Sequence, residues 1–287
     1  MASEHVKVAV DGDDMVLWKE AATRVRLAQA TLDQLGDPAP GSGLAQDDMR
    51  CNGPYISDSV RGHLDAALDN LTLWANVVAP RVFIKDVPVE NPPRPYFTLA
   101  RAGLESAAQA VWLLSPQEQD ERIARHLRLA VNDLEEMRRT ARLVDSSAEE
   151  AVKERIVAVR DTAGGPIKVA PNYLDMVRAA ANLGGLEPDD AEALWRTASA
   201  AAHGKLWFLE ATYSTDLGEE FSAGRFRAVR RPDAGTISTV VTLATEVTER
   251  AVVRYALMLG APLERITQRA VEQLRKNLPR TVTPAPE

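Results

Sequence analysis

Cysteine and aromatic residues are scarce in this chain of 287 residues. Cys51 is the single cysteine, which excludes a disulfide within the chain and a cysteine-based metal site. Because aromatic residues make up only 5% of the chain, the core must be built from Ala, Leu and Val, and this favours closely packed helices. We expect no cofactor and no metal ion, since the sequence has no HExxH, Walker, GxSxG or GxGxxG motif.

Long apolar runs are also missing. No stretch approaches the roughly 20 apolar residues that a membrane-spanning helix needs, and the acidic residues 1–14 lack the apolar segment of a secretion signal. We therefore expect a cytoplasmic protein with no membrane contact. The 34 basic and 41 acidic residues give a net charge of −7, which argues against indiscriminate adhesion to nucleic acid but leaves room for a local basic groove.

The apolar residues that are present recur at helical spacing. Steps of four and three residues place them on one face of a helix over residues 14–35 and again over 57–78. Further helices are predicted at 96–114, 116–141, 147–161, 171–183, 188–203, 236–259 and 262–277. Strands and helices do not alternate, so we predict an all-α fold, an antiparallel bundle of about eight or nine helices.

Other segments contain the residues that interrupt helices. Residues 36–56, rich in Gly, Pro, Ser and Asp, predict a loop, and the five prolines of residues 80–95 predict an extended linker. Residues 206–213 and 221–231 predict one small β-hairpin with its turn at 216–220, although its first half could equally extend the preceding helix. The expected domains are a helix pair (1–79), the linker (80–95), a helical bundle (96–278) and a disordered tail (279–287), with a single domain as the alternative.

The segment 194–204 carries the residues best suited to chemistry. Arg196 and His203 are seven residues apart, so both side chains project from nearly the same helix face, about 10 Å apart along the axis. Arginine binds phosphate oxygens in a bidentate manner, and histidine transfers protons near neutral pH. The alanines around them allow a neighbouring helix to approach closely, and the pattern predicts a phosphate site.

This Arg-x6-His pattern, with Arg101 and Glu105 upstream, resembles the Arg-x(4–6)-His motif of HEPN-type proteins. Many of those are metal-independent endoribonucleases of toxin–antitoxin and defence systems. The resemblance implies a HEPN-like bundle over residues 96–278 and a homodimer in which two such helices face each other. It also implies that His203 acts as general base or acid on RNA, that Arg196 stabilises the phosphorane, and that Glu105 orients His203.

A second patch combines arginine with phenylalanine. Residues 221–231 contain no acid and carry four arginines, Arg225, Arg227, Arg230 and Arg231, beside Phe221 and Phe226. Such a mixture suits backbone phosphates and stacked bases, so we predict RNA contact here. The alternative is a solvated hairpin whose cations balance the acids at 216–220.

Less specific interpretations stand beside these. Glu192 with Arg196, and Arg101 with Glu105, have the i, i+4 spacing of ordinary helix-surface ion pairs, and His203 could cap the end of its helix. The protein would then be a non-catalytic helical interaction protein with an unknown protein partner. A third possibility is an antitoxin-like partner whose arginine-rich hairpin holds nucleic acid.

Overall fold

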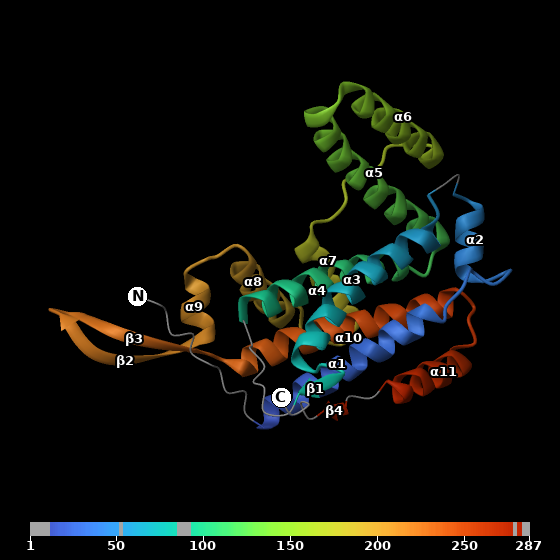
Figure 1. The fold of residues 1–287 in the computed structure, drawn as a ribbon. Helices are drawn as coiled ribbons and strands as arrows, with labels where there is room; N and C mark the ends of the chain where they lie inside the picture. The colour runs from blue at the N-terminus through green and yellow to red at the C-terminus, as the bar shows by residue number, and fades with distance from the viewer. Residues whose placement is uncertain (1–11, 52–53, 85–92, 278–279, 283–287) are drawn as a thin grey trace.

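The computed structural model describes residues 12–51, 54–84, 93–277 and 280–282. In these residues it has eleven helices and four strands, with a single projecting hairpin after residue 205 (Figure 1). The all-α class and the small hairpin predicted from the sequence are confirmed. None of the described helices is both long and apolar enough to cross a membrane.

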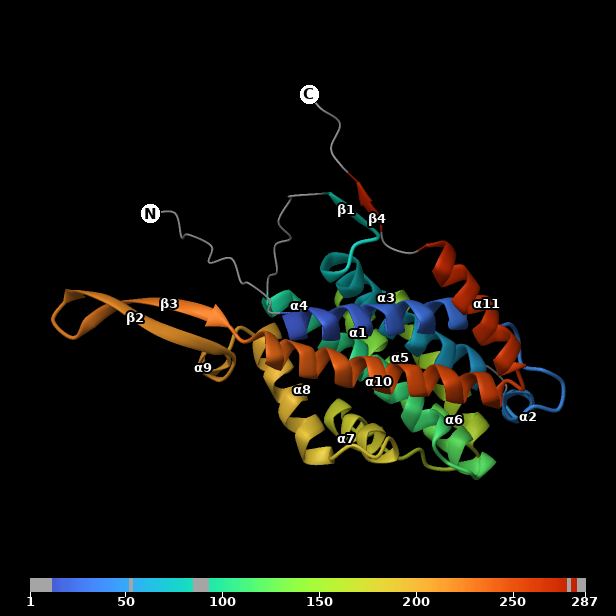
Figure 2. The ribbon, with the colours of Figure 1, turned by 90° about the horizontal axis from the view of Figure 1, so that it is seen from below.

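Four long helices form the main layer of the bundle, seen from two sides in Figures 1 and 2. They are α1 (Gly12–Asp33), α3 (Ile56–Val78), α4 (Pro93–Leu114) and α10 (Ala234–Met258). A Cβ added to Gly103 of α4 would lie 2.8 Å from Leu71 Cγ of α3, so glycine permits the close approach of these two helices. All four helices share one hydrophobic core, and residues 85–92 of the expected linker lie outside the described residues.

The few aromatic residues join this layer at its centre. The ring of Trp18 on α1 makes edge contacts with Trp74 and Tyr96, at centroid distances of 6.4 and 5.8 Å. Trp18 Nε1 also donates a hydrogen bond of 2.8 Å to Ser238 Oγ. Because these partners come from α3, α4 and α10, one indole connects all four helices.

Two further helices project from the bundle as a helical hairpin (Figure 1). They are α5 (Gln119–Val144) and α6 (Ser146–Ala163), and they have a small apolar cluster of their own, built from Leu127, Leu134, Val152, Ile156 and Val159. The root of α5 is fixed to α2 (Gly43–Met49) by an ion pair between Arg122 and Asp47.

Two local predictions around these helices were wrong. The expected loop 36–56 contains α2, which Ser42 caps by accepting a hydrogen bond from the Ala45 N–H and whose Leu44 side chain is buried. The helix predicted to begin at residue 116 begins at Gln119 instead. The hydroxyl of Ser115 donates back to the Trp112 carbonyl at 3.1 Å.

The remaining helices cover the bundle. Helices α7 (Tyr173–Leu183) and α8 (Pro188–Ala202) pack on α4, and α11 (Leu263–Lys276) packs on α1. Helix α8 begins and ends within one residue of its predicted bounds, because Pro188 lies at its first position and Gly204, with φ of 64°, follows its end. The candidate site lies where α8 packs against α4.

The hairpin lies later in the chain than predicted. Residues 207–212 form helix α9 (Trp207–Thr212), since Phe208 is buried against Phe97 with ring centroids 5.1 Å apart. Strands β2 (Tyr213–Ser222) and β3 (Arg225–Pro232) then pair antiparallel. The turn falls at residues 223–224, where Gly224 adopts a φ of 70°.

A second, two-stranded sheet brings distant segments together. Strand β1 (Val82–Ile84) pairs in parallel with β4 (Arg280–Val282). The expected linker and the expected disordered tail therefore each contribute a strand, because the two backbones satisfy each other's hydrogen bonds. Residues 279 and 283–287 of that tail lie outside the described residues.

Candidate functional site

His203 lies at the exposed end of α8. Its backbone N–H still bonds to the Ser199 carbonyl at 3.0 Å, and Gly204 then turns the chain away. The imidazole is exposed to solvent. A histidine in this position can meet a substrate from outside the bundle.

Arg101 on α4 contacts that imidazole. Its Nη1 atom lies 3.4 Å from His203 Nε2. A guanidinium has only N–H donors and no acceptor, so any hydrogen bond in this contact runs from Arg101 to the histidine nitrogen. The contact places a guanidinium beside an imidazole at an exposed helix end.

Glu105 fixes Arg101 from the other side. Its Oε1 atom accepts hydrogen bonds from Arg101 Nε at 2.9 Å and from Trp195 Nε1 at 2.8 Å. The guanidinium carbon of Arg101 also lies 5.6 Å from the centroid of the Trp195 ring. The carboxylate thus holds Arg101 between α4 and α8, and Arg101 lies between Glu105 and His203.

Arg196 has a different partner. Its Nε and Nη2 atoms lie 2.7 Å from Glu192 Oε1, and 57% of its side chain is exposed. Hydrogen bonds from Arg196 and then from Arg178 lower the pKa of Glu192 below its usual value. The cation that contacts His203 is therefore Arg101, while Arg196 lies two helical turns away along α8.

Further cations and an exposed indole surround this end of α8. Arg94 donates to the Ala201 carbonyl at 3.2 Å and lies over the ring of Phe208. Lys205 and Trp207, which follow His203 in the chain, are exposed, and the exposed fraction of Trp207 is 45%. Cations beside an exposed aromatic ring can bind a phosphate backbone and stack a base.

The four hairpin arginines lie on a separate part of the molecule, because the hairpin points away from α8 (Figure 1). Arg231 lies 3.4 Å from Asp216, with both side chains more than half exposed. Within the described residues, Arg225, Arg227 and Arg230 form no ion pair. The structure therefore does not join the two predicted RNA-contacting groups into one site.

Two other histidines line a hollow of about 470 Å³ between α3, α5 and α6. Burial, together with the neighbouring His126, lowers the pKa of His63 to about 4. Burial also lowers the pKa of His126, whose Nε2 lies 2.8 Å from the Pro54 carbonyl. In the part of the chain that the structure describes, no three His, Cys, Asp or Glu side chains gather as metal ligands.

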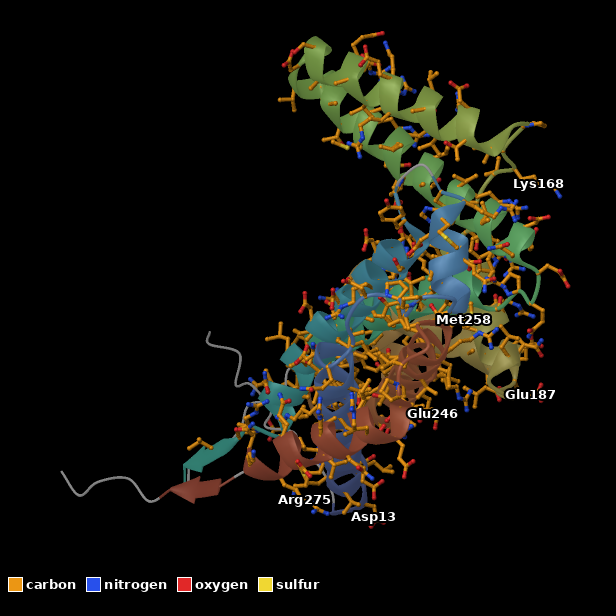
Figure 3. The ribbon with its side chains drawn as sticks, turned by 90° about the vertical axis from the view of Figure 1, so that its right-hand side faces the viewer. Asp13, Lys168, Glu187, Glu246, Met258 and Arg275 are labelled. Carbon is orange, nitrogen blue, oxygen red and sulfur yellow. The ribbon has the colours of Figure 1, made fainter. Side chains whose placement is uncertain are left out.

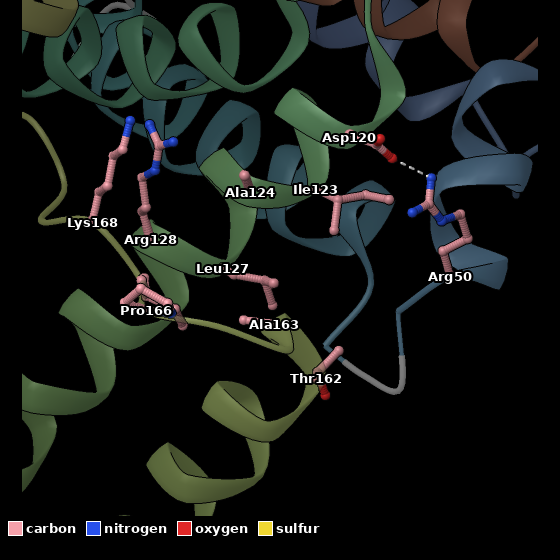
Figure 4. Close-up of a pocket in the computed structure, with 11 residues that line it drawn as sticks. Arg50, Asp120, Ile123, Ala124, Leu127, Arg128, Thr162, Ala163, Pro166 and Lys168 are labelled. Carbon is pink, nitrogen blue, oxygen red and sulfur yellow. Dashed lines mark hydrogen bonds and ion pairs between the residues drawn. The ribbon is translucent and has the colours of Figure 1, made fainter.

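A second hollow, of about 340 Å³, lies where α5 meets residues 162–168 (Figure 4). Arg50, Arg128 and Lys168 line it together with Asp120. Arg50 is already paired with Asp120 at 2.6 Å. This basic hollow is distinct from the His203 site and was not indicated by any sequence motif.

Comparison of the chain with protein-family models, with curated proteins and with solved structures gave no match. The candidate site therefore depends on its own geometry. Sequence spacing indicated Arg101, Glu105 and His203 separately, but it gave no sign that Arg101 and His203 meet across 102 residues. It gave no sign either of the hydrogen bond from the Trp195 indole to Glu105.

Proposed function

We propose that this protein is a metal-independent endoribonuclease in which His203 and Arg101 face the scissile phosphate. The observation that carries the proposal is the 3.4 Å contact between Arg101 Nη1 and His203 Nε2, at an exposed helix end where Glu105 fixes the arginine. The resemblance of the Arg-x6-His pattern to HEPN-type proteins supports the same reaction. On that resemblance alone, we place the protein in a defence or toxin–antitoxin system, and the sequence pattern leads us to place it in the cytoplasm.

The reaction follows from the chemistry of these two side chains. The substrate phosphate replaces His203 as the acceptor for Arg101 Nη1, which frees the Nε2 lone pair. His203 Nε2 then removes the proton from a ribose 2′-hydroxyl, and the 2′-oxygen attacks the adjacent phosphorus. The bond from phosphorus to the 5′-oxygen breaks, and that oxygen takes a proton from water. The products are a 2′,3′-cyclic phosphate and a 5′-hydroxyl, and His203 returns its proton to solvent.

Arg101 supplies the positive charge that this reaction needs. The non-bridging phosphate oxygens gain negative charge as the 2′-oxygen attacks, and fixed N–H donors stabilise that charge. Because Glu105 and Trp195 already hold Arg101, little reorganisation accompanies catalysis. Arg196, two turns away and exposed, is placed to contact a neighbouring phosphate, so its contribution is to binding.

The test is cleavage of an end-labelled RNA oligonucleotide in the presence of EDTA. We expect His203→Ala and Arg101→Ala each to lower kcat by about 10² or more. Arg196→Ala should raise KM with little change in kcat, and Arg139→Ala, an exposed change on α5, should alter neither. An oligonucleotide with a single 2′-deoxy ribose at the cleaved bond should resist cleavage there.

Other results of the same assay would contradict the proposal. Absence of cleavage under these conditions contradicts the proposal, and so does cleavage that His203→Ala leaves unchanged. Cleavage at the 2′-deoxy position would show that the 2′-oxygen is not the nucleophile.

A second candidate function is that of a non-catalytic helical interaction protein. It is favoured by the position of Glu105, whose side chain is only 15% exposed and whose two hydrogen bonds connect α4 with α8. In that case these contacts serve packing. Glu105→Gln would lower the melting temperature, and His203→Ala would change no RNA chemistry.

A further inference from the structure

The hairpin formed by β2 and β3, here called the arm (residues 213–232), extends beyond Tyr213 without cover from the other residues that the structure describes. Every residue from Ser214 to Ser222 is exposed, and so are the large apolar side chains Leu217 (69%), Phe221 (61%) and Phe226 (45%). A two-stranded ribbon by itself is marginally stable in water. The arm therefore has the composition of an element that packs against a second surface.

The charge of the arm is divided between its two strands. Strand β3 carries the four arginines and no acid, whereas the acids lie on β2. One arginine, Arg231, is paired with Asp216. Side chains alternate along a strand, so Arg230 lies on the same face of β3 as Phe226, whereas Arg225 and Arg227 lie on the opposite face. The Phe226 face therefore combines an unpaired cation with an exposed aromatic ring.

An acidic groove of about 560 Å³ lies between α1, the start of α8 and the first half of α10. Its floor is apolar and includes Leu17, Leu186, Leu194 and Leu243. Asp14, Glu187, Asp190 and Glu246 also line it, and none of the described residues that line it is basic. We call this the acidic groove; Glu187 and Glu246, from two of its walls, are labelled in Figure 3.

The carboxylates of the acidic groove are only partly neutralised. Glu246 lies 3.9 Å from Arg24 and 3.8 Å from Arg250, at the outer limit of an ion pair. In the described part of the chain, Glu187 and Asp190 form no ion pair. A ligand that carries both cations and apolar side chains would pair with the carboxylates of the acidic groove and cover its leucines.

We propose that the arm of one copy of this chain docks in the acidic groove of a second copy, and that the exchange is reciprocal. Arginines would meet carboxylates, and the arm's exposed phenylalanines would cover the leucines of the floor. The groove rejects RNA, because its carboxylates repel phosphate, so a protein partner fits it and a nucleic acid does not. A second copy supplies the required cations and aromatic rings without any other partner.

The layout of the chain permits the exchange. The arm ends at Pro232, and the acidic groove begins only three residues later, at Gly235. Eight residues of β3 span about 27 Å, and residues 235–246 of α10 span about 17 Å. In two copies related by a two-fold axis, each arm could therefore extend past the base of the partner's arm and lie in the partner's acidic groove. Both arms and both grooves are then occupied, so the assembly stops at a dimer.

The test is the oligomeric state of the purified full-length chain, measured by light scattering on a sizing column and by sedimentation. We expect a dimer of twice the 31.3 kDa chain mass, with a dissociation constant that rises with salt. Arg230→Glu and Asp190→Arg should each raise that constant at least tenfold. Combined in one chain, the two changes should restore much of the dimer.

Two further variants make the result specific. Arg265→Glu, the same charge change at an exposed position of α11, should leave the dissociation constant unchanged. Phe226→Ser should weaken the dimer without altering any charge. A chain that stays monomeric at high micromolar concentration overturns the proposal. So does an Arg230→Glu variant that loses affinity for a labelled RNA oligonucleotide while its oligomeric state is unchanged, since the arm would then be an RNA contact.

Discussion

Replacement of Arg122 by methionine should strongly destabilise the fold. Arg122 binds Asp47 through two hydrogen bonds, from Nε at 2.7 Å and from Nη2 at 2.8 Å. The Asp47 side chain is fully buried, and that of Arg122 is 9% exposed. This pair joins α2 to the root of α5, from which the α5–α6 hairpin projects.

The expected magnitude comes from the burial of the carboxylate. In Arg122→Met the charge of Asp47 stays buried without its partner, which costs about 3–5 kcal/mol of unfolding free energy. Replacing both residues, as Asp47→Leu with Arg122→Met, removes the orphaned charge and should recover most of the loss. The carbonyls of Pro116 and Gln117, which Arg122 also binds, can turn to water in both variants.

The assay is urea denaturation followed by circular dichroism. Arg139→Met on the same helix is the matched control, because Arg139 and Glu136 are each more than 60% exposed and such pairs contribute about 0–1 kcal/mol. A loss below about 1 kcal/mol in Arg122→Met would refute this reasoning. A double variant as unstable as the single one would refute it as well.

The remaining predictions concern His63 and two glycines. Burial and the nearby His126 lower the pKa of His63 from 6.5 to about 4. Between pH 4 and pH 6.5 the unfolded chain therefore binds a proton at His63 that the folded chain does not. The unfolding free energy should therefore fall by roughly 3 kcal/mol as pH drops from 6.5 to 4. His63→Gln should flatten that dependence in denaturation curves, and an unchanged slope would contradict the assignment. Gly103→Ala should lower stability by about 1–3 kcal/mol, because its Cβ would overlap the buried Leu71 side chain. Gly62→Ala, with open space around it on α3, should instead raise stability by about 0.5–1 kcal/mol, and equal effects of the two changes would refute the packing argument.

The long helices could be predicted because their apolar residues follow a local period. The predicted helix at 57–78 appears at Ile56–Val78, and the one at 188–203 appears at Pro188–Ala202. Helix α2 could not be predicted in this way. It is seven residues long, and its buried Asp47 depends on Arg122, which lies 75 residues away in the chain.

In the candidate site, too, contacts between residues close in the sequence could be predicted and long-range contacts could not. Both i, i+4 ion pairs suggested by the spacing exist, Arg101 with Glu105 and Arg196 with Glu192. The contact between Arg101 and His203 could not be predicted, because it depends on how α4 and α8 pack. The acidic groove could not be predicted either, because its walls come from three elements that no sequence pattern connects.

The most direct test of the central claim is RNA cleavage by the purified protein in EDTA, with the product ends identified. The pairing of His203 with Arg101 predicts 2′,3′-cyclic phosphate ends, formed at a rate that His203→Ala reduces by about 10² or more. RNA that remains intact, or that is cleaved equally fast by the His203→Ala protein, would contradict the claim.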